Sequence, residues 1–395
     1  MKKNNSGSSP FSRLFLFLTA SLLITASCRK THIDDKALRD FQQVNLVANN
    51  SAYAPGLVDP TLQNAWGIAW SSTGIAWVNS LSGHVSELYT SEGAIVRPPV
   101  NIPSPADTIG GLPTGIVFSG GKGFILPNKQ AAAFIFVGID GILSAWNGAA
   151  GNNAFRIKNN SATSSYTGLA LAANGGRNYI YAANFRTGKI DVWDTTFTAV
   201  NLPFRDPAIP AGYAPFNIQG IGSWLYVLYA KVGPDGRDQA GAGLGFVDIY
   251  NTDGSFVKRF ASRDKLNAPW GVVMTPASFL EDHDMGDDDK GGDNHGSNGG
   301  SSNSGSGHSG HDDGLHNDDP VILVGNFGDG RINAYSVDGQ FLGQLQSHNR
   351  TIVIDGLWSL SFAQATAPTI DPNRLYFTAG PKKETDGLFG YLIKP

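Results

Sequence analysis

Short runs in which apolar and polar residues alternate recur along the chain about every fifty residues. Six of these runs open with a turn glycine and place apolar residues at every second position, which predicts β-strands. They are GHVSELY from Gly83, GILSAWN from Gly141, GKIDVWD from Gly188, GFVDIYN from Gly245, GRINAYS from Gly330 and GLFGYLI from Gly387. The intervals are 58, 47, 57, 85 and 57 residues. The long interval returns to about 46 when one polar segment of about 39 residues is left out.

Three further strands accompany each of these runs. An earlier strand has the form AWGIAW, PTGIVF, YTGLAL, IQGIGS (with Gly220), PWGVVM or LWSLSF, and a strand such as YIYAAN or VILVGN lies between the two. A later strand follows, as in the near copies DGSFVKRFAS and DGQFLGQLQS. Four strands in about fifty residues, repeated six times, predict an all-β chain folded as a six-bladed β-propeller.

The ends of the chain predict how this ring closes. The sixth repeat reaches Pro395 without a fourth strand, whereas FQQVNL (41–46) matches FTAVNL (197–202), the fourth strand of the third repeat. We therefore expect residues 41–395 to form one propeller whose last blade is completed by the N-terminal strand. Such closure removes an exposed strand edge.

The first residues have the pattern of a bacterial lipoprotein signal. A basic start, MKK, precedes the apolar run LFLFLTASLLI and then TASC, which ends at Cys28, the one cysteine of the chain. Eleven residues are too few for a membrane span of roughly 20. We predict a signal peptide over 1–27, a lipid on Cys28, a tether over 28–40 and a place in the bacterial outer membrane. An ordinary signal peptide with an incidental cysteine is the alternative, because Thr25 replaces the usual leucine.

Composition narrows the classes of partner. The net charge is −4, and 41% of residues are hydrophobic while 16% are charged. No basic patch of the kind that binds nucleic acid is present in the sequence. The 49 glycines suit the many turns of an all-β fold. The expected state is a monomer that contacts the membrane through its lipid only.

The polar segment from Glu281 to Asp319 is rich in Asp, His, Gly and Ser. It falls between the first and second strands of blade five and has almost no apolar residues, so we predict a disordered insertion. Its acids do not match an EF-hand calcium loop. His308, His311 and His316 could hold Zn²⁺ or Cu²⁺, although a solvated acidic loop is the simpler interpretation.

Candidate ligand-binding residues lie where predicted strands end at the channel mouth. The polar residues singled out there are Asn79, Asn128, Asn184, Asn326, Asp355 and Glu384. Amide and carboxylate oxygens at one rim could bind a divalent cation, the only cofactor these residues suggest, or a sugar. Asparagine is equally a favoured turn residue that tolerates left-handed geometry. No G-x-S-x-G elbow appears, and we identify no catalytic residue.

The segments NAWGIAW, AANFRTGKIDVWD, VGNFGDGRINAYS and LYFTAGPKKETDGLFGYL resemble an uncharacterised family of secreted bacterial six-bladed propellers of the NHL and TolB-like type. The resemblance covers nearly all of residues 41–395. It implies the fold and an export route but no activity.

Three functions remain open. The expected function is a lipid-anchored, non-catalytic scaffold of the cell envelope that binds a protein, a glycan or a small molecule. The first alternative is a metal-dependent hydrolase resembling regucalcin-type lactonases, whose metal-binding motifs are nevertheless missing from this sequence. The second alternative is a structural or adhesive component of the envelope.

Overall fold

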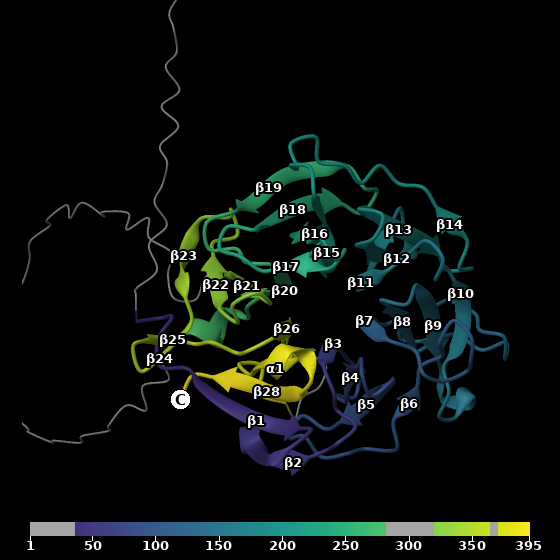
Figure 1. The fold of residues 1–395 in the computed structure, drawn as a ribbon, viewed down its shortest axis with the longest axis horizontal. Helices are drawn as coiled ribbons and strands as arrows, with labels where there is room; N and C mark the ends of the chain where they lie inside the picture. The colour runs from purple at the N-terminus through teal and green to yellow at the C-terminus, as the bar shows by residue number, and fades with distance from the viewer. Residues whose placement is uncertain (1–35, 282–319, 364–369) are drawn as a thin grey trace, which may run out of the picture. The chain divides into compact units, whose positions relative to one another are not determined.

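Six antiparallel sheets form the structure of this protein, a computed structural model that describes residues 36–281, 320–363 and 370–395. Each sheet is one blade, and the blades stand around a common centre (Figure 1). The innermost strands, in chain order, are β3 (Ala65–Trp70), β7 (Pro113–Phe118), β11 (Tyr166–Asn174), β15 (Tyr213–Ile221), β20 (Pro269–Met274) and β26 (Leu357–Ser361). Each lies against the next, and β26 lies against β3, so the ring is closed.

The other strands of each blade follow outward from its innermost strand. The second strands are β4 (Ala76–Ser80), β8 (Phe134–Gly138), β12 (Arg177–Asn184), β16 (Trp224–Val232), β21 (Ile322–Asn326) and β27 (Leu375–Ala379). The third strands are β5 (Val85–Tyr89), β9 (Ile142–Trp146), β13 (Lys189–Asp194), β18 (Gly245–Asn251), β22 (Ile332–Tyr335) and β28 (Leu388–Ile393). The outer strands are β6 (Val100–Asn101), β10 (Phe155–Asn159), β14 (Ala199–Val200), β19 (Phe256–Ser262), β23 (Phe341–Gln344) and β1 (Gln42–Ala48). The predicted six blades of four strands are confirmed.

The predicted closure is confirmed as well. Strand β1 runs antiparallel to β28, from the pair Gln42 and Ile393 to the pair Ala48 and Leu388. The short strand β2 (Leu57–Val58) then adds to β1 in parallel. Ordered packing begins before residue 41, where the tether was expected to end, because Ala37 and Leu38 are almost fully buried in the core shared by blades five and six.

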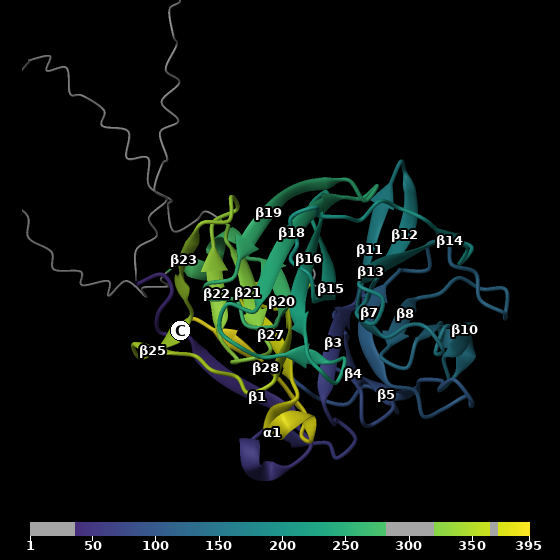
Figure 2. The same ribbon diagram turned by 45° about the horizontal axis from the view of Figure 1, so that its top comes forward.

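A few short elements complete the described part of the chain. Strand β17 (Asp238–Gln239) pairs with the end of β16, and β24 (Gln346–Ser347) forms a small hairpin with β25 (Arg350–Thr351). The helical turns are η1 (Ser51–Tyr53), η2 (Gly148–Ala150), η3 (Ala277–Leu280) and α1 (Pro381–Glu384). Helix α1 joins β27 to β28, beyond the ends of these strands (Figure 2). We call the face where the six innermost strands begin the α1 face.

The expected insertion has the predicted place between two paired strands of blade five. Strand β20 ends at Met274, which is paired with Ile322 of β21. Between them, η3 buries Phe279 and Leu280 in the core. Residues 282–319 themselves, with the three candidate histidines His308, His311 and His316, lie outside the described residues, as does Cys28.

Two details of the predicted strands differ from the structure: which residue of β15 faces the centre, and where Asn128 lies. Gly220 lies in β15 as predicted, but Asn217 of the same strand is the residue that faces the centre beside the glycines of the other blades. Asn128 does not end a second strand, because β8 begins only at Phe134. Asn128 lies instead in a turn, where it exchanges hydrogen bonds with the side chain of Asn147.

Candidate functional site

The central channel is narrow because neighbouring innermost strands approach closely. Gly67, Gly115 and Gly271 line a central cavity of only about 30 Å³ together with Asn217 and Ser359. A methyl group added at Gly115 would overlap the backbone of the next innermost strand. This is why glycine recurs at this position in the predicted strands. At this level the space suits a water molecule or two rather than a substrate. Toward the ends of the innermost strands, away from the α1 face, the channel widens to a cavity of about 320 Å³ lined by Trp70, Phe118 and Phe362 among others.

Aromatic side chains fill the channel at the α1 face. The rings of Trp66 and Trp358 stack with centroids 3.5 Å apart, and Trp270 meets both edge-on at about 6 Å. Phe327 stacks on the other side of Trp358 at 3.8 Å. Trp358 is completely buried, so this aromatic cluster acts as a hydrophobic plug.

A polar rim surrounds this plug. The indole Nε1 of Trp358 donates to Asn64 Oδ1 at 2.8 Å, and Asn64 Nδ2 donates to Glu384 Oε2 at 2.9 Å. Arg237, in the loop that carries β17, reaches across from blade four and donates to Glu384 Oε1 at 2.6 Å. Burial, together with the negative charge of Glu384, raises the pKa of Asp238 to about 6. The rim is therefore an ion-paired network that joins blades four, six and one.

The turn that presents Glu384 has an uncommon backbone. Lys382, Lys383 and Glu384 all have positive φ angles, of 57°, 58° and 68°, so α1 is a left-handed turn. Each such residue costs roughly 1–2 kcal/mol. Asp355 helps to hold the turn, because its Oδ2 accepts a hydrogen bond of 2.8 Å from the Lys382 backbone N–H.

The predicted rim asparagines Asn79, Asn184 and Asn326 do end second strands at this face, and all three are buried. None of them has a positive φ, so the left-handed explanation does not apply to them. Asn79 donates to the Thr114 carbonyl at 3.0 Å. Asn184 donates to Asp191 at 2.9 Å and accepts from the backbone N–H of Ser165 and of Thr187.

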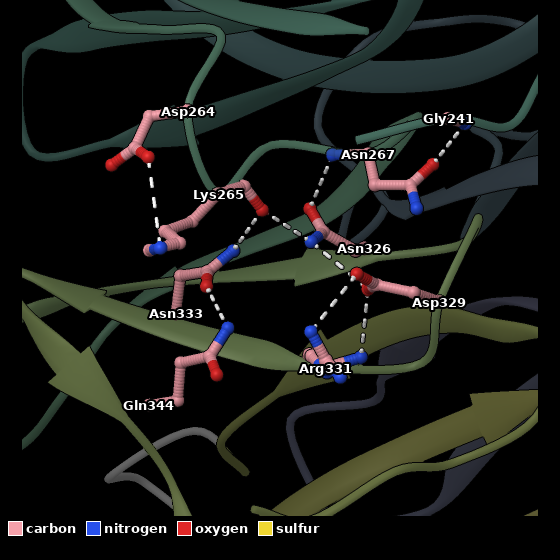
Figure 3. Close-up of polar contacts among 9 residues, drawn as sticks. All are labelled: Gly241, Asp264, Lys265, Asn267, Asn326, Asp329, Arg331, Asn333 and Gln344. Atoms are coloured by element: carbon pink, nitrogen blue, oxygen red, sulfur yellow. Dashed lines mark hydrogen bonds and ion pairs between the residues drawn. The ribbon is translucent and has the colours of Figure 1, made fainter. Parts of the chain in front are cut away.

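Asn326 is held in the same way by its own and the neighbouring loop. Its amide donates to the Lys265 carbonyl at 2.7 Å and to Asp329 at 3.0 Å, while its oxygen accepts from the Asn267 N–H at 3.1 Å (Figure 3). Asn184 and Asn326 therefore have hydrogen-bond partners in their own and neighbouring loops. No hydrogen bond in the described part of the chain joins any two of the six predicted residues.

A pair of buried carboxylates was missed by the sequence analysis. Thr61 Oγ1 lies 2.6 Å from Asp59 Oδ1 and 2.5 Å from Glu87 Oε1, and Tyr89 donates to Asp59 Oδ2 at 2.8 Å. One hydroxyl proton cannot serve both carboxylates, so Glu87 needs a proton of its own. Burial of Glu87, with the charge of Asp59 adding to it, raises its pKa to about 7.

The carboxylate pair borders a surface groove. The groove has a volume of about 410 Å³ and is lined by Asp59, Thr61, Glu87 and residues 95–99, of which Ile95 is 53% exposed. A carboxyl group with a pKa near neutrality can give or take a proton at physiological pH. The sequence did contain a signal for this pair. Glu87 is an acid on the same face of the strand as Val85 and Tyr89, which are buried.

A second and larger groove lies between blades two and three. Its volume is about 740 Å³, and β10, β13 and the residues after β14 form its walls. Its lining combines apolar side chains such as Ile190 and Leu202 with the cations of Lys158, Lys189 and Arg205.

Metal-ligand clusters and membrane spans give no further candidate. Residues 36–281, 320–363 and 370–395 contain no group of three or more His, Cys, Asp or Glu side chains that could hold a metal ion. Within the same residues, no helix is both long and apolar enough to cross a membrane.

Solved structures match this chain at low similarity. Virginiamycin B lyase from Staphylococcus aureus is 12% identical with a TM-score of 0.45, covering 90% of this chain and 99% of that one. A streptogramin B lyase structure is 12% identical with a TM-score of 0.46, covering 89% and 96%. Hydrazine synthase from Kuenenia stuttgartiensis is 14% identical with a TM-score of 0.42, covering 81% and 74%. We infer no activity from similarities at this level.

Curated relatives of the chain are viral proteins. No family model matches it. Uncharacterized protein R648 of Acanthamoeba polyphaga mimivirus is 29% identical over 368 residues, which are 89% of this chain and 80% of that protein. Uncharacterized protein L690 of the same virus is 30% identical over 370 residues, 89% of this chain and 86% of that protein. The expected relatives were bacterial, whereas these relatives are viral. The chain belongs to the same family of six-bladed propellers as uncharacterized protein L690 of the mimivirus.

Proposed function

We propose that this propeller is a binding scaffold without catalytic chemistry, and that it binds its partner outside the central channel. The observation that carries the proposal is the filled α1 face, where a ligand would have to displace the stack of Trp66, Trp270 and Trp358. The side chains of Asn184, Asn326 and Glu384, expected to bind a ligand there, are already used by neighbouring groups. Asn79 donates to a backbone carbonyl, and its Oδ1 has no hydrogen-bond partner among the described residues.

Rigid blades with grooves between them fit this role. A closed ring holds its outer strands and loops in fixed positions, so a partner can bind without ordering the scaffold. No residue of an innermost strand lines either of the two grooves described above, which have volumes of about 740 and 410 Å³. Their mixed apolar and charged lining is typical of recognition surfaces rather than of closed reaction pockets.

The lipid anchor is the second part of the proposal. The segment MKK, the apolar run to Ile24 and the sequence TASC support export, acylation of Cys28 and a place in the bacterial outer membrane. This support comes from the sequence alone, since the viral relatives offer none for a bacterial envelope.

The scaffold is tested by metal content and hydrolysis. The protein from Thr31 onward and a version lacking Glu281–Asp319 are assayed for bound metal by mass spectrometry and for cleavage of lactone and ester substrates. We expect both forms to lack stoichiometric metal and to show no hydrolysis above the buffer rate. Stoichiometric metal in the shortened form, with hydrolysis that a chelator abolishes, would instead establish the hydrolase.

The anchor is tested by expressing the full chain in a Gram-negative host with an alkyne-labelled fatty acid. The wild-type chain should carry the label and sediment with the outer membrane, and Cys28→Ser should lose both properties. An unlabelled wild-type chain in the soluble fraction would overturn the anchor and leave the scaffold proposal unaffected.

A further inference from the structure

The outer edge of blade three is only partly covered. Strand β14 pairs with β13 at Val192 and Trp193 alone. In blade four, by contrast, β19 follows β18 from Phe246 to Tyr250. The three residues of β13 from Lys189 to Asp191 therefore have no strand beside them on the outer side within the described residues.

The backbone of this free edge is available for hydrogen bonds. The Asp194 N–H donates outward to the Thr198 carbonyl at 3.0 Å. Alternate residues of an antiparallel strand direct their N–H and C=O groups to the same side. Ile190 therefore directs both groups toward the outer edge, where no described strand pairs with it. Such an unpaired edge is the feature to which an extended peptide adds as an extra strand.

A groove of suitable size lies along this edge. After Val200 the chain leaves β13 and continues as residues 201–205, which belong to no strand. The space between this segment and β13 is the groove of about 740 Å³. Ile190, Leu202 and Phe204 are half-buried in it and offer apolar contacts to every second side chain of an added strand.

The charge of the groove selects the partner. Lys158, Lys189 and Arg205 line it, and none of them forms an ion pair or a side-chain hydrogen bond with any residue that the structure describes. The one carboxylate in the lining, Asp191, already accepts hydrogen bonds from Asn184 and Tyr166. Three free cations on a chain with a net charge of −4 make this groove locally basic.

We propose that the groove between blades two and three binds an extended acidic peptide segment of a partner protein, which adds to β13 beside Ile190 as an extra strand. The inference rests on the proposed binding function and names its surface and partner class. Main-chain hydrogen bonds from Ile190 hold the segment, alternate apolar side chains fill the groove, and acidic side chains pair with the three cations.

The test uses the full chain and a fluorescent, acetylated nonapeptide of alternating glutamate and valine, at low ionic strength where exposed charges act most strongly. A lysine–valine nonapeptide is the charge control. We expect saturable binding of the acidic peptide only. The variant Lys158→Glu/Lys189→Glu/Arg205→Glu should weaken binding by about tenfold or more.

A matched variant separates the groove from general charge. Lys122→Glu/Lys129→Glu/Arg350→Glu reverses three exposed cations outside this groove and should leave the affinity within about twofold. Equal losses in the two variants, or equal binding of heparin and the acidic peptide, would show non-specific attraction to polyanions and overturn the proposal.

Hydrogen exchange tests the added strand without any substitution. Saturating peptide should slow exchange of the Ile190 amide by at least about fivefold and leave amides of blade five unchanged. Unchanged exchange at Ile190, or a dimer in light scattering that protects the same amide without peptide, would reject the peptide-binding site. Either result leaves the scaffold in place, because only metal-dependent hydrolysis removes the proposed function itself.

Discussion

Glu87 is the residue whose chemistry departs most from its surroundings. It lies on the same face of β5 as the buried residues Val85 and Tyr89, and it is 2% exposed. A charged carboxylate there is costly, so the folded protein favours the protonated acid, which can donate a proton to Thr61 Oγ1. The carboxyl group is therefore sensitive to pH in the range near neutrality.

Replacing Glu87 by glutamine should change how stability depends on pH. The folded pKa of Glu87, about 7, lies above its ordinary value of 4.5, so the free energy of unfolding should fall as pH rises from about 4.5 to about 7. Glu87→Gln keeps a donor toward Thr61 but cannot ionise. We expect it to be close to neutral at pH 5 and to stabilise the protein by about 1 to 3 kcal/mol at pH 8.

Urea denaturation at the two pH values measures this effect. Asp338→Asn serves as the control, because the Asp338 side chain is 92% exposed, and it should give the same difference from wild type at both pH values. If Glu87→Gln destabilised the protein equally at pH 5 and pH 8, Glu87 would be ionised in the folded state.

For individual residues, the sequence predicted positions along the strands better than it predicted hydrogen-bond partners. The ends of three second strands were predictable from alternation, and Asn79, Asn184 and Asn326 are found there. Whether an amide is free depends on the loop that packs beside it, such as the Lys265 carbonyl for Asn326. The pairing of Asp59 with Glu87 was unpredictable for the same reason, because the two residues come from different elements.

Among the elements, the left-handed turn α1 is the least predictable from sequence. Its residues PKKE contain no glycine, although left-handed geometry favours glycine. The turn persists because Asp355, Asn64 and Arg237 hold it from three separate segments. Only the assembled rim supplies these partners, and the local sequence cannot reveal them.

Substitutions at Lys383 should report this strain. Lys383 is exposed and has φ 58° and ψ 46°. Lys383→Gly should stabilise the protein by about 0.5–1 kcal/mol, because glycine adopts this geometry without strain. Lys383→Val should destabilise it by about 1–2 kcal/mol, because a β-branched side chain fits left-handed geometry poorly. Thermal unfolding followed by circular dichroism measures both.

The control for Lys383 is Lys122, an exposed lysine with a negative φ. Lys122→Gly should not raise the melting temperature. A lower melting temperature for Lys383→Gly than for the wild type would mean that the rim relaxes the turn and that no strain is stored there.

Strand register shows the limit of repeat matching. The glycine that faces the channel in most blades is replaced by Asn217 in blade four, whose Nδ2 donates to the Trp270 carbonyl at 2.7 Å. A search for the glycine therefore shifted the predicted match to Gly220. The same reasoning misplaced Asn128, because a long turn before β8 imitates the end of a strand.

For the whole molecule, the prediction from sequence was strong because six weak signals repeat at one period. A single strand such as β9 could belong to many folds, whereas six such strands at similar spacing specify a ring. The closure by β1 followed from one missing strand and one surplus strand. The choice of binding surface did not follow, since the grooves depend on how loops and strand ends pack beside one another in the folded chain.

Removing the closing strand should destabilise the entire ring. Strand β1 covers the edge of β28, and the preceding Phe41 is fully buried against Phe279 at 5.1 Å. A protein that begins at Asn49 loses these contacts and exposes a long edge. We expect it to aggregate on expression or to melt at least about 10 °C below the protein that begins at Thr31.

Differential scanning calorimetry and light scattering measure this loss. The control begins at Lys36, where the described structure starts, and should melt within about 2 °C of the longer protein. A monomer starting at Asn49 with unchanged melting would show that blade six is stable with three strands.

The closing strand also makes the order of the blades independent of where the polypeptide starts. Gln42 and Ile393 are direct neighbours in one sheet, so a flexible linker from Pro395 to Lys36 could join the two ends and keep the buried Ala37, Leu38 and Phe41. The gene could then be cut between any two blades and its halves exchanged. Such a circular permutant should encode the same ring, and its new ends could lie on any side of the molecule where a fusion partner or a surface attachment is wanted.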